Sequence, residues 1–323
     1  MRRFEVDLVK AIGIATVVLI HSLRPFFVPQ SSRTELVLGS ILQFAVPGFL
    51  AASGFLYASG ERASAAVTRR RLARLLVPYL LASLAAHVFW YVFDGRTPAP
   101  RALLESLLLA SAFGPYYYVL VAVLFVVATP ALLRLGPRAL GALTVAGIAA
   151  QCVLWMSLPF SFFWMFRNPL HWAGFFLAGF WLGRHEPSAT ARIGSRRGLI
   201  CGASVAVAGV AALLRADTQS YELGGALSSL FVWSVLLALF AFAAQREGRS
   251  RAIRFLSDST YTIYLFHLFA VFPMQRFVPA PPGVFDPVPI GATWLVGFVA
   301  PLLLAAAGRA VLGASRSRAL LGS

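Results

Sequence analysis

The sequence predicts an all-α, polytopic membrane protein with about ten transmembrane helices and both termini in the cytoplasm. Three observations predict this class: of the 323 residues 59% are hydrophobic, only 12% are charged, and the mean hydropathy is +0.76. A soluble domain carries about 25% charged residues, so little room is left for one. We expect a single membrane-embedded domain over residues 1–323.

Apolar runs close to the length of about 20 residues that crosses a bilayer recur along the whole chain. The sixth run is short, and the fourth begins with polar aromatic residues. The stretch 103–113 is too short to span and is predicted to form an interfacial or re-entrant helix. The predicted spans are 6–28, 37–59, 75–93, 117–134, 139–157, 170–184, 198–214, 224–244, 256–276 and 290–312.

The first run follows Met1-Arg2-Arg3 and therefore resembles a signal peptide. It contains Asp7 and Lys10, exceeds the usual length of an apolar signal region and lacks a small-residue cleavage site. We therefore expect an uncleaved first span.

The arginines predict the orientation of the chain in the membrane. Of the 28 basic residues one is lysine, and with both termini inside 20 of the remaining 27 lie on the cytoplasmic side, as the positive-inside rule requires. The net charge of +16 is then an orientation signal and a contact for anionic lipid, so no nucleic-acid partner is expected. Cys152 and Cys201 fit no metal spacing, and no metal is expected. We expect a multi-pass protein of a bacterial plasma membrane, with its oligomeric state left open.

One face of the first span carries four ionisable residues, Asp7, Lys10, His21 and Arg24, within about 100° of the helix circumference. Ionisable groups are costly inside a bilayer, so such a stripe indicates a functional site. His21 lies 15 residues beyond Val6, about 22 Å along the axis, in the outer half of the bilayer. Its imidazole can take a proton from a hydroxyl near neutral pH. In the alternative, Lys10 snorkels inward and His21 bonds a neighbouring carbonyl.

Arginines cluster at the predicted cytoplasmic start of the third span. Their spacings of three and four residues place several guanidinium groups on one helix face. Forked guanidinium groups suit phosphates, including those of a coenzyme, although an ordinary positive-inside anchor has the same composition. The arginines are Arg69, Arg70, Arg71 and Arg74.

A third polar stretch begins the ninth span, where Ser257 or Asp258 is expected to cap a helix. Tyr261, Tyr264 and His267 then share one side of that helix. Such a stripe favours either a cavity or hydrogen bonds between helices, and the residues do not decide between them.

Together these stretches resemble the acyltransferase 3 family, which includes O-acyltransferases of surface polysaccharides and macrolide sugars. Asp7-Leu-Val-Lys10 through His21 is similar to its first-span signature, with lysine where many members carry arginine. The resemblance extends to the proline, aromatic and Ser-Gly-Phe pattern around Ser53, to the arginine cluster and to the segment ending at His267. The fourth span departs, since it begins Gly-Pro-Tyr-Tyr-Tyr where members often have Trp-Phe-Leu.

The resemblance implies transfer of an acyl group, acetyl first, from cytoplasmic acyl-CoA to a hydroxyl of a carbohydrate or glycosylated acceptor, as in polysaccharide O-acetylation. The activity would reside in the membrane domain alone. The arginine cluster would hold the coenzyme phosphates, and the pantetheine arm would lie along the first span. His21 would deprotonate the hydroxyl or be acylated itself. Asp7 and Lys10 are the other two implied catalytic residues, with Asp7 paired to Lys10 or an arginine. The implied substrate contacts are Arg24, Ser53, Tyr264 and His267, among which Ser53, Tyr264 and His267 are the candidate oxyanion donors.

A transporter or exporter of glycans or small molecules is the competing class, because the same polar stripe would line a path. Paired half-helices or an inverted repeat would favour that class, and neither is visible in the sequence. A purely structural membrane component would leave the stripe without a role.

Overall fold

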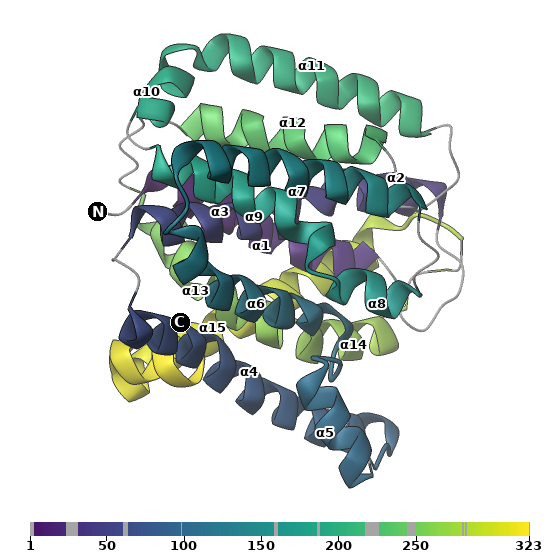
Figure 1. Ribbon diagram of the computed structural model, residues 1–323. Coiled ribbons are helices and arrows are strands. Elements are labelled where there is room, and N and C mark those ends of the chain that lie inside the picture. Colours follow the sequence, from purple (N-terminus) through teal and green to yellow (C-terminus); the bar gives the residue numbers. More distant parts are fainter. Residues whose placement is uncertain are drawn as a thin grey trace. The chain divides into compact units, whose positions relative to one another are not determined.

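The computed structural model describes residues 3–23, 32–60, 64–97, 99–157, 161–185, 188–216, 226–243, 250–279, 281 and 283–322. Every regular element in these ranges is a helix, as the composition predicts (Figure 1). The helices are α1 (Phe4–Leu23), α2 (Arg33–Ile41), η1 (Leu42–Phe44), α3 (Ala45–Ser59), α4 (Ala65–Asp94), α5 (Pro100–Leu108), η2 (Gly114–Tyr116), α6 (Tyr117–Leu132), α7 (Pro137–Ser157), α8 (Phe162–Arg167), α9 (Leu170–Arg184), α10 (Ser188–Ser195), α11 (Arg197–Ala216), α12 (Ala226–Ala243), α13 (Arg251–Phe266), α14 (Leu268–Phe277) and α15 (Pro287–Leu320).

Within the described ranges, five helical segments are long and apolar enough to cross a membrane. Two further apolar helices, Arg197–Ala211 and Ser228–Ala243, are shorter. These segments agree with a multi-pass membrane protein, while the count of ten spans and the cytoplasmic termini stay predictions. The five are Phe4–Leu23, Val37–Ser59, Ala65–Asp94, Gly114–Leu132 and Pro287–Leu320.

The predicted ninth span differs in two ways from the helices that form there. It is interrupted at His267, which lies in a turn between α13 and α14. The expected cap at Ser257 or Asp258 is wrong, because α13 begins earlier, at Arg251. The Ser250 hydroxyl instead accepts the backbone N–H of Ile253 at 3.4 Å, which satisfies one of the first donors of the helix.

The chain folds into two compact units. The first unit comprises Met1–Thr16, Leu36–Ala63 and Ala128–Ser257, and the second comprises Val17–Glu35, Ser64–Val127 and Asp258–Ser323. Helix α1 continues from the first unit into the second, so its two ends belong to different packing environments. The prediction of one functional domain over the whole chain is not tested by this division.

The first unit is organised around the close packing of α3 against α9 (Figure 1). Gly179 and Gly183 lie one turn apart on α9, a spacing that lets helix backbones approach closely in membranes. A Cβ atom at Gly179 would meet the backbone of Ala51, and one at Gly183 would meet the carbonyl of Phe55. The glycines therefore set how closely these two helices pack.

The second unit buries a cluster of aromatic rings from α4, α14 and the segment before η2. The Trp90 ring lies 5.0 Å from that of Phe272, and the Phe113 ring lies 5.0 Å from that of Phe269. The indole N–H of Trp90 donates to the carbonyl of Ala112 at 3.1 Å. Aromatic pairs at such distances contribute beyond their buried area, so the cluster fixes α14 against α4.

Candidate active site

The two predicted catalytic residues near the start of α1 belong to the first unit. The Asp7 side chain is buried, and its Oδ1 accepts the hydroxyl of Ser257, which is also buried, at 2.6 Å. This bond joins α1 to α13 within the first unit. Lys10 is half-buried on the same helix. The predicted catalytic roles of Asp7 and Lys10, and the pairing of Asp7 with Lys10 or an arginine, stay predictions.

His21 lies at the other end of α1, in the second unit, beside His267. The centroids of the two imidazole rings are 5.2 Å apart, and the ring planes are tilted by 37°. His267 is completely buried, whereas His21 is half-buried. Two residues far apart in the sequence, each predicted on a separate polar stripe, thus meet in one place.

A glutamine that sequence reasoning missed holds the backbone at this place. The Gln275 side-chain amide donates to the carbonyl oxygen of His21 at 2.9 Å. Gln275 is buried on α14, two turns after His267. The signal that would have found it is an amide side chain inside the apolar run 268–277, because buried polar groups in membranes pair with other helices.

The tyrosines of the ninth-span stripe form hydrogen bonds between helices. The Tyr264 hydroxyl donates to the carbonyl of Pro115, and the Tyr116 hydroxyl donates to the carbonyl of Leu265 at 2.6 Å. Both side chains are buried. Because a tyrosine hydroxyl has one hydrogen to donate, Tyr264 in this arrangement has none left for an oxyanion.

The same stripe connects α13 to the arginine-bearing helix α4. The Tyr261 hydroxyl donates to the carbonyl of Leu75 at 2.7 Å, one residue after Arg74. From Tyr261 to His267 is six residues, about 9 Å of helix rise. Tyr261, which binds the residue after the last arginine, therefore lies about one and two-thirds turns of helix before His267, within the second unit.

The arginines themselves occupy the first turns of α4. That helix begins at Ala65, ahead of the predicted span, because the Ser64 hydroxyl caps it by accepting the backbone N–H of Val67 at 3.2 Å. Three of the four arginines have exposed side chains and one is half-buried. The exposed three are Arg69, Arg70 and Arg74, and the half-buried one is Arg71.

Two predicted substrate contacts fall elsewhere. Arg24 lies outside the described residues. Ser53 is half-buried on α3 in the first unit, next to a glycine whose added Cβ would meet the backbone of Phe176 on α9. Neither residue is brought to the imidazole pair by a described contact, and both assignments stay predictions.

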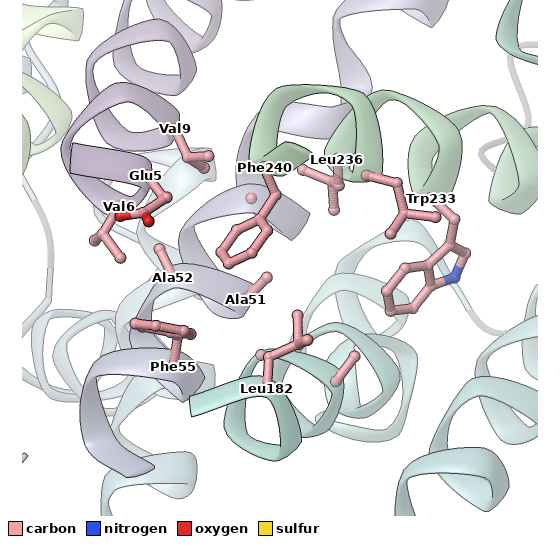
Figure 2. Close-up of a pocket in the computed structure, with 14 residues that line it drawn as sticks. Glu5, Val6, Val9, Ala51, Ala52, Phe55, Leu182, Trp233, Leu236 and Phe240 are labelled. Atoms are coloured by element: carbon pink, nitrogen blue, oxygen red, sulfur yellow. The ribbon is translucent and has the colours of Figure 1, made fainter. Parts of the chain in front are cut away.

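The first unit also contains a pocket between α1, α3, α9 and α12 (Figure 2). Its empty volume is about 570 Å³, which includes space that is open to the surroundings. Its walls are almost entirely apolar, and Figure 2 shows the ring of Phe240 facing Ala51 and Ala52 across it. Glu5 supplies a buried carboxylate at one end, which sequence reasoning missed. Such a pocket suits an aliphatic chain that carries a hydrogen-bond donor.

Comparison with known protein families gives a match over most of the chain. The family model described as an acyltransferase domain, acyltransferase 3, matches residues 3–309. Comparison with curated proteins and comparison with solved structures each give no match. The family match covers nearly the whole chain and confirms the resemblance seen in the sequence. The chain belongs to the acyltransferase 3 family.

Proposed function

We propose that the protein transfers an acyl group, acetyl first, from cytoplasmic acyl-CoA to a hydroxyl of a carbohydrate or glycosylated acceptor, at a bacterial plasma membrane. Membership of an acyltransferase family and the apolar helices support the general class of a membrane acyltransferase. The observation that carries the finer assignment is the pairing of His21 with His267 in the second unit, at a ring distance of 5.2 Å.

The donor would be held by the arginines at the start of α4. Arg69 and Arg74 are exposed near the beginning of that helix, and guanidinium groups suit the phosphates of coenzyme A. The hydrogen bond from Tyr261 to Leu75 keeps this end of α4 against α13. An extended pantetheine arm can cover the about 9 Å of helix rise between Tyr261 and His267.

His21 would act as the general base. The acceptor O–H bond breaks as its proton moves to the imidazole, and the oxygen attacks the thioester carbonyl. The C–O bond forms, the C–S bond breaks, and the leaving thiolate takes the proton from the imidazolium. The products are the acyl ester and free coenzyme A, so no other reactant is required.

The oxyanion of this reaction needs a donor other than Tyr264, whose hydroxyl donates to the Pro115 carbonyl. His267 is also a poor candidate, because its Nδ1 faces the carbonyl oxygens of Ile263 and Tyr264. Ser53 remains a predicted substrate contact.

The test uses purified protein in lipid nanodiscs, labelled acyl-CoA donors of increasing chain length, and methyl glycosides, polysaccharide fragments and a macrolide glycoside as acceptors. We expect release of coenzyme A that depends on the acceptor, together with an alkali-labile labelled ester on that acceptor. Movement of an acceptor across vesicles containing the protein, without acylation from any donor, would instead indicate the transporter class.

A further inference from the structure

The protonation of His267 follows from its surroundings. Its Nδ1 lies 2.8 Å from the carbonyl oxygen of Tyr264 and 3.1 Å from that of Ile263. Carbonyl oxygens only accept hydrogen bonds, so the proton of the neutral ring is assigned to Nδ1. The other nitrogen, Nε2, is then unprotonated and presents a lone pair.

That lone pair is buried. His267 has no solvent-exposed surface, and Nε2 has no hydrogen-bond partner within the described residues. An acceptor left unsatisfied in the interior costs about 1–3 kcal/mol. Such an atom in a folded protein calls for a partner that arrives during function or after a small rearrangement.

The ring of His21 is at the right distance to be that partner. A linear hydrogen bond of about 2.9 Å between two imidazole nitrogens separates their ring centroids by about 5.2 Å. The observed separation of the His21 and His267 centroids is 5.2 Å. The structure itself forms no hydrogen bond at His267 Nε2 among the described residues, so a rotation of the half-buried His21 side chain is the change that would align the bond.

The surrounding contacts hold both partners at this distance. Gln275 binds the backbone carbonyl of His21, and His267 directly precedes α14, the helix that carries Gln275. On α15, Gly297 faces Val18 of α1 and Val271 of α14, and an added Cβ would lie 2.6 Å from a methyl group of Val271. Glycine at this position therefore lets α1 and α14 approach each other beside α15.

We propose that His267 is the positioning partner of the catalytic base: its Nε2 accepts a hydrogen bond from one ring nitrogen of His21, which leaves the other ring nitrogen of His21 unprotonated toward the acceptor hydroxyl. This inference rests on the proposed function, in which His21 is the base. A buried acceptor that fixes the tautomer of a catalytic histidine also stabilises the imidazolium formed during proton transfer. His267 keeps its own Nδ1 proton throughout.

The kinetic test compares His267→Leu with His267→Gln. Leucine cannot accept a hydrogen bond, whereas glutamine places an amide oxygen near the position of Nε2. We expect His267→Leu to lower kcat by about 100-fold, with the KM values of donor and acceptor changed by less than about threefold. We expect His267→Gln to regain about tenfold of that loss. His185→Gln, at the end of α9, is the matched control and should keep the wild-type kcat.

An equal loss of kcat in His267→Gln and His267→Leu would overturn the proposal, because a merely structural role does not depend on a hydrogen-bond acceptor at this atom. An effect on KM in place of kcat would overturn it as well.

A second measurement separates this inference from the proposed function. The chain has 5 histidines, so selective ¹⁵N-histidine labelling and solid-state NMR in lipid bilayers can resolve them, with His267 assigned from its absence in His267→Gln. We expect a neutral ring protonated at Nδ1 and a coupling across an N–H···N bond between His21 and His267. If this pairing is seen while no donor supports acyl transfer, the pairing stands and the proposed function fails. A proton on Nε2 of His267 would overturn the inference whatever the activity.

Discussion

Replacing Gly179 by alanine tests the packing of α3 against α9 most sharply. The added Cβ would lie 2.6 Å from the backbone carbonyl carbon of Ala51 and 2.8 Å from its Cα. Ordinary contacts between carbon atoms are about 3.5–4.0 Å, so the two helices must separate by about 1 Å. The obstructing atoms belong to the backbone and cannot rotate away.

The free energy of unfolding should fall by about 2 kcal/mol in Gly179→Ala. Overpacking a filled site costs about 1–3 kcal/mol, and a rigid backbone obstacle places this site at the upper end. The higher helix propensity of alanine relative to glycine offsets about 1 kcal/mol of this cost. A net loss of about 2 kcal/mol changes the folding equilibrium constant about 30-fold.

Gly202 on α11 provides the matched control, because a Cβ there meets no atom within 4 Å. Gly202→Ala should leave stability unchanged or raise it by up to about 1 kcal/mol. Both variants are measured by unfolding in mixed micelles of increasing SDS content, followed by tryptophan fluorescence. Equal stability of Gly179→Ala and Gly202→Ala would refute the close approach of α3 and α9.

Three further predictions concern the polar contacts. Removing two forked cations in Arg71→Gln/Arg74→Gln should raise the KM for acyl-CoA about tenfold or more, with little change in the KM for the acceptor, as steady-state kinetics will show. Removing the hydrogen bond to Asp7 in Ser257→Ala should lower the free energy of unfolding by about 1.5–3 kcal/mol, and a double-mutant cycle with Asp7→Ala, which removes the acceptor, should recover most of this as coupling. Tyr116→Phe keeps the buried ring and loses its bond to a carbonyl, so SDS unfolding should show a loss of about 1–2 kcal/mol.

The control for the arginine pair is Arg196→Gln/Arg197→Gln, which removes the same charge from exposed positions at the start of α11. An equal rise in the donor KM in this control would show that α4 has no special role in binding coenzyme A. Additive effects of Ser257→Ala and Asp7→Ala would contradict a direct bond between them. An unchanged stability in Tyr116→Phe would contradict the contribution of its hydroxyl.

The membrane class and the family were predictable because each depends on local information. Hydropathy over a window finds the spans at Val37–Ser59 and Gly114–Leu132 within a few residues, since each span needs its own apolar run. The signature from Asp7 to His21 and the arginine cluster are likewise contiguous. The start of α4 at Ala65 was missed, because the predicted third span begins at residue 75, where the apolar run starts. Ser64, a good capping residue just before the helix, was the local signal for it.

The arrangement of the site could not be read in the same way. The bond from Tyr264 to Pro115 joins residues 149 positions apart, and the contact of His267 with His21 spans a longer stretch of chain. The break at His267 has neither glycine nor proline at that position to announce it, because the backbone there keeps helical dihedral angles while the side chain binds the carbonyl oxygens of Ile263 and Tyr264. The sequence predicted that Tyr261, Tyr264 and His267 share one side of a helix. Only the structure shows that the two tyrosines bind carbonyl groups of other segments, whereas the ring of His267 lies beside that of His21.

The role of His21 in acyl transfer is tested most directly with the variant His21→Ala. The measurement is the rate of label transfer from acyl-CoA to a hydroxyl acceptor by purified protein in nanodiscs, beside His185→Ala as a histidine control outside the site. We predict that His21→Ala, with wild-type stability in SDS unfolding, loses at least about 100-fold in kcat, while His185→Ala keeps its rate. Undiminished transfer by a folded His21→Ala protein would contradict the proposed mechanism.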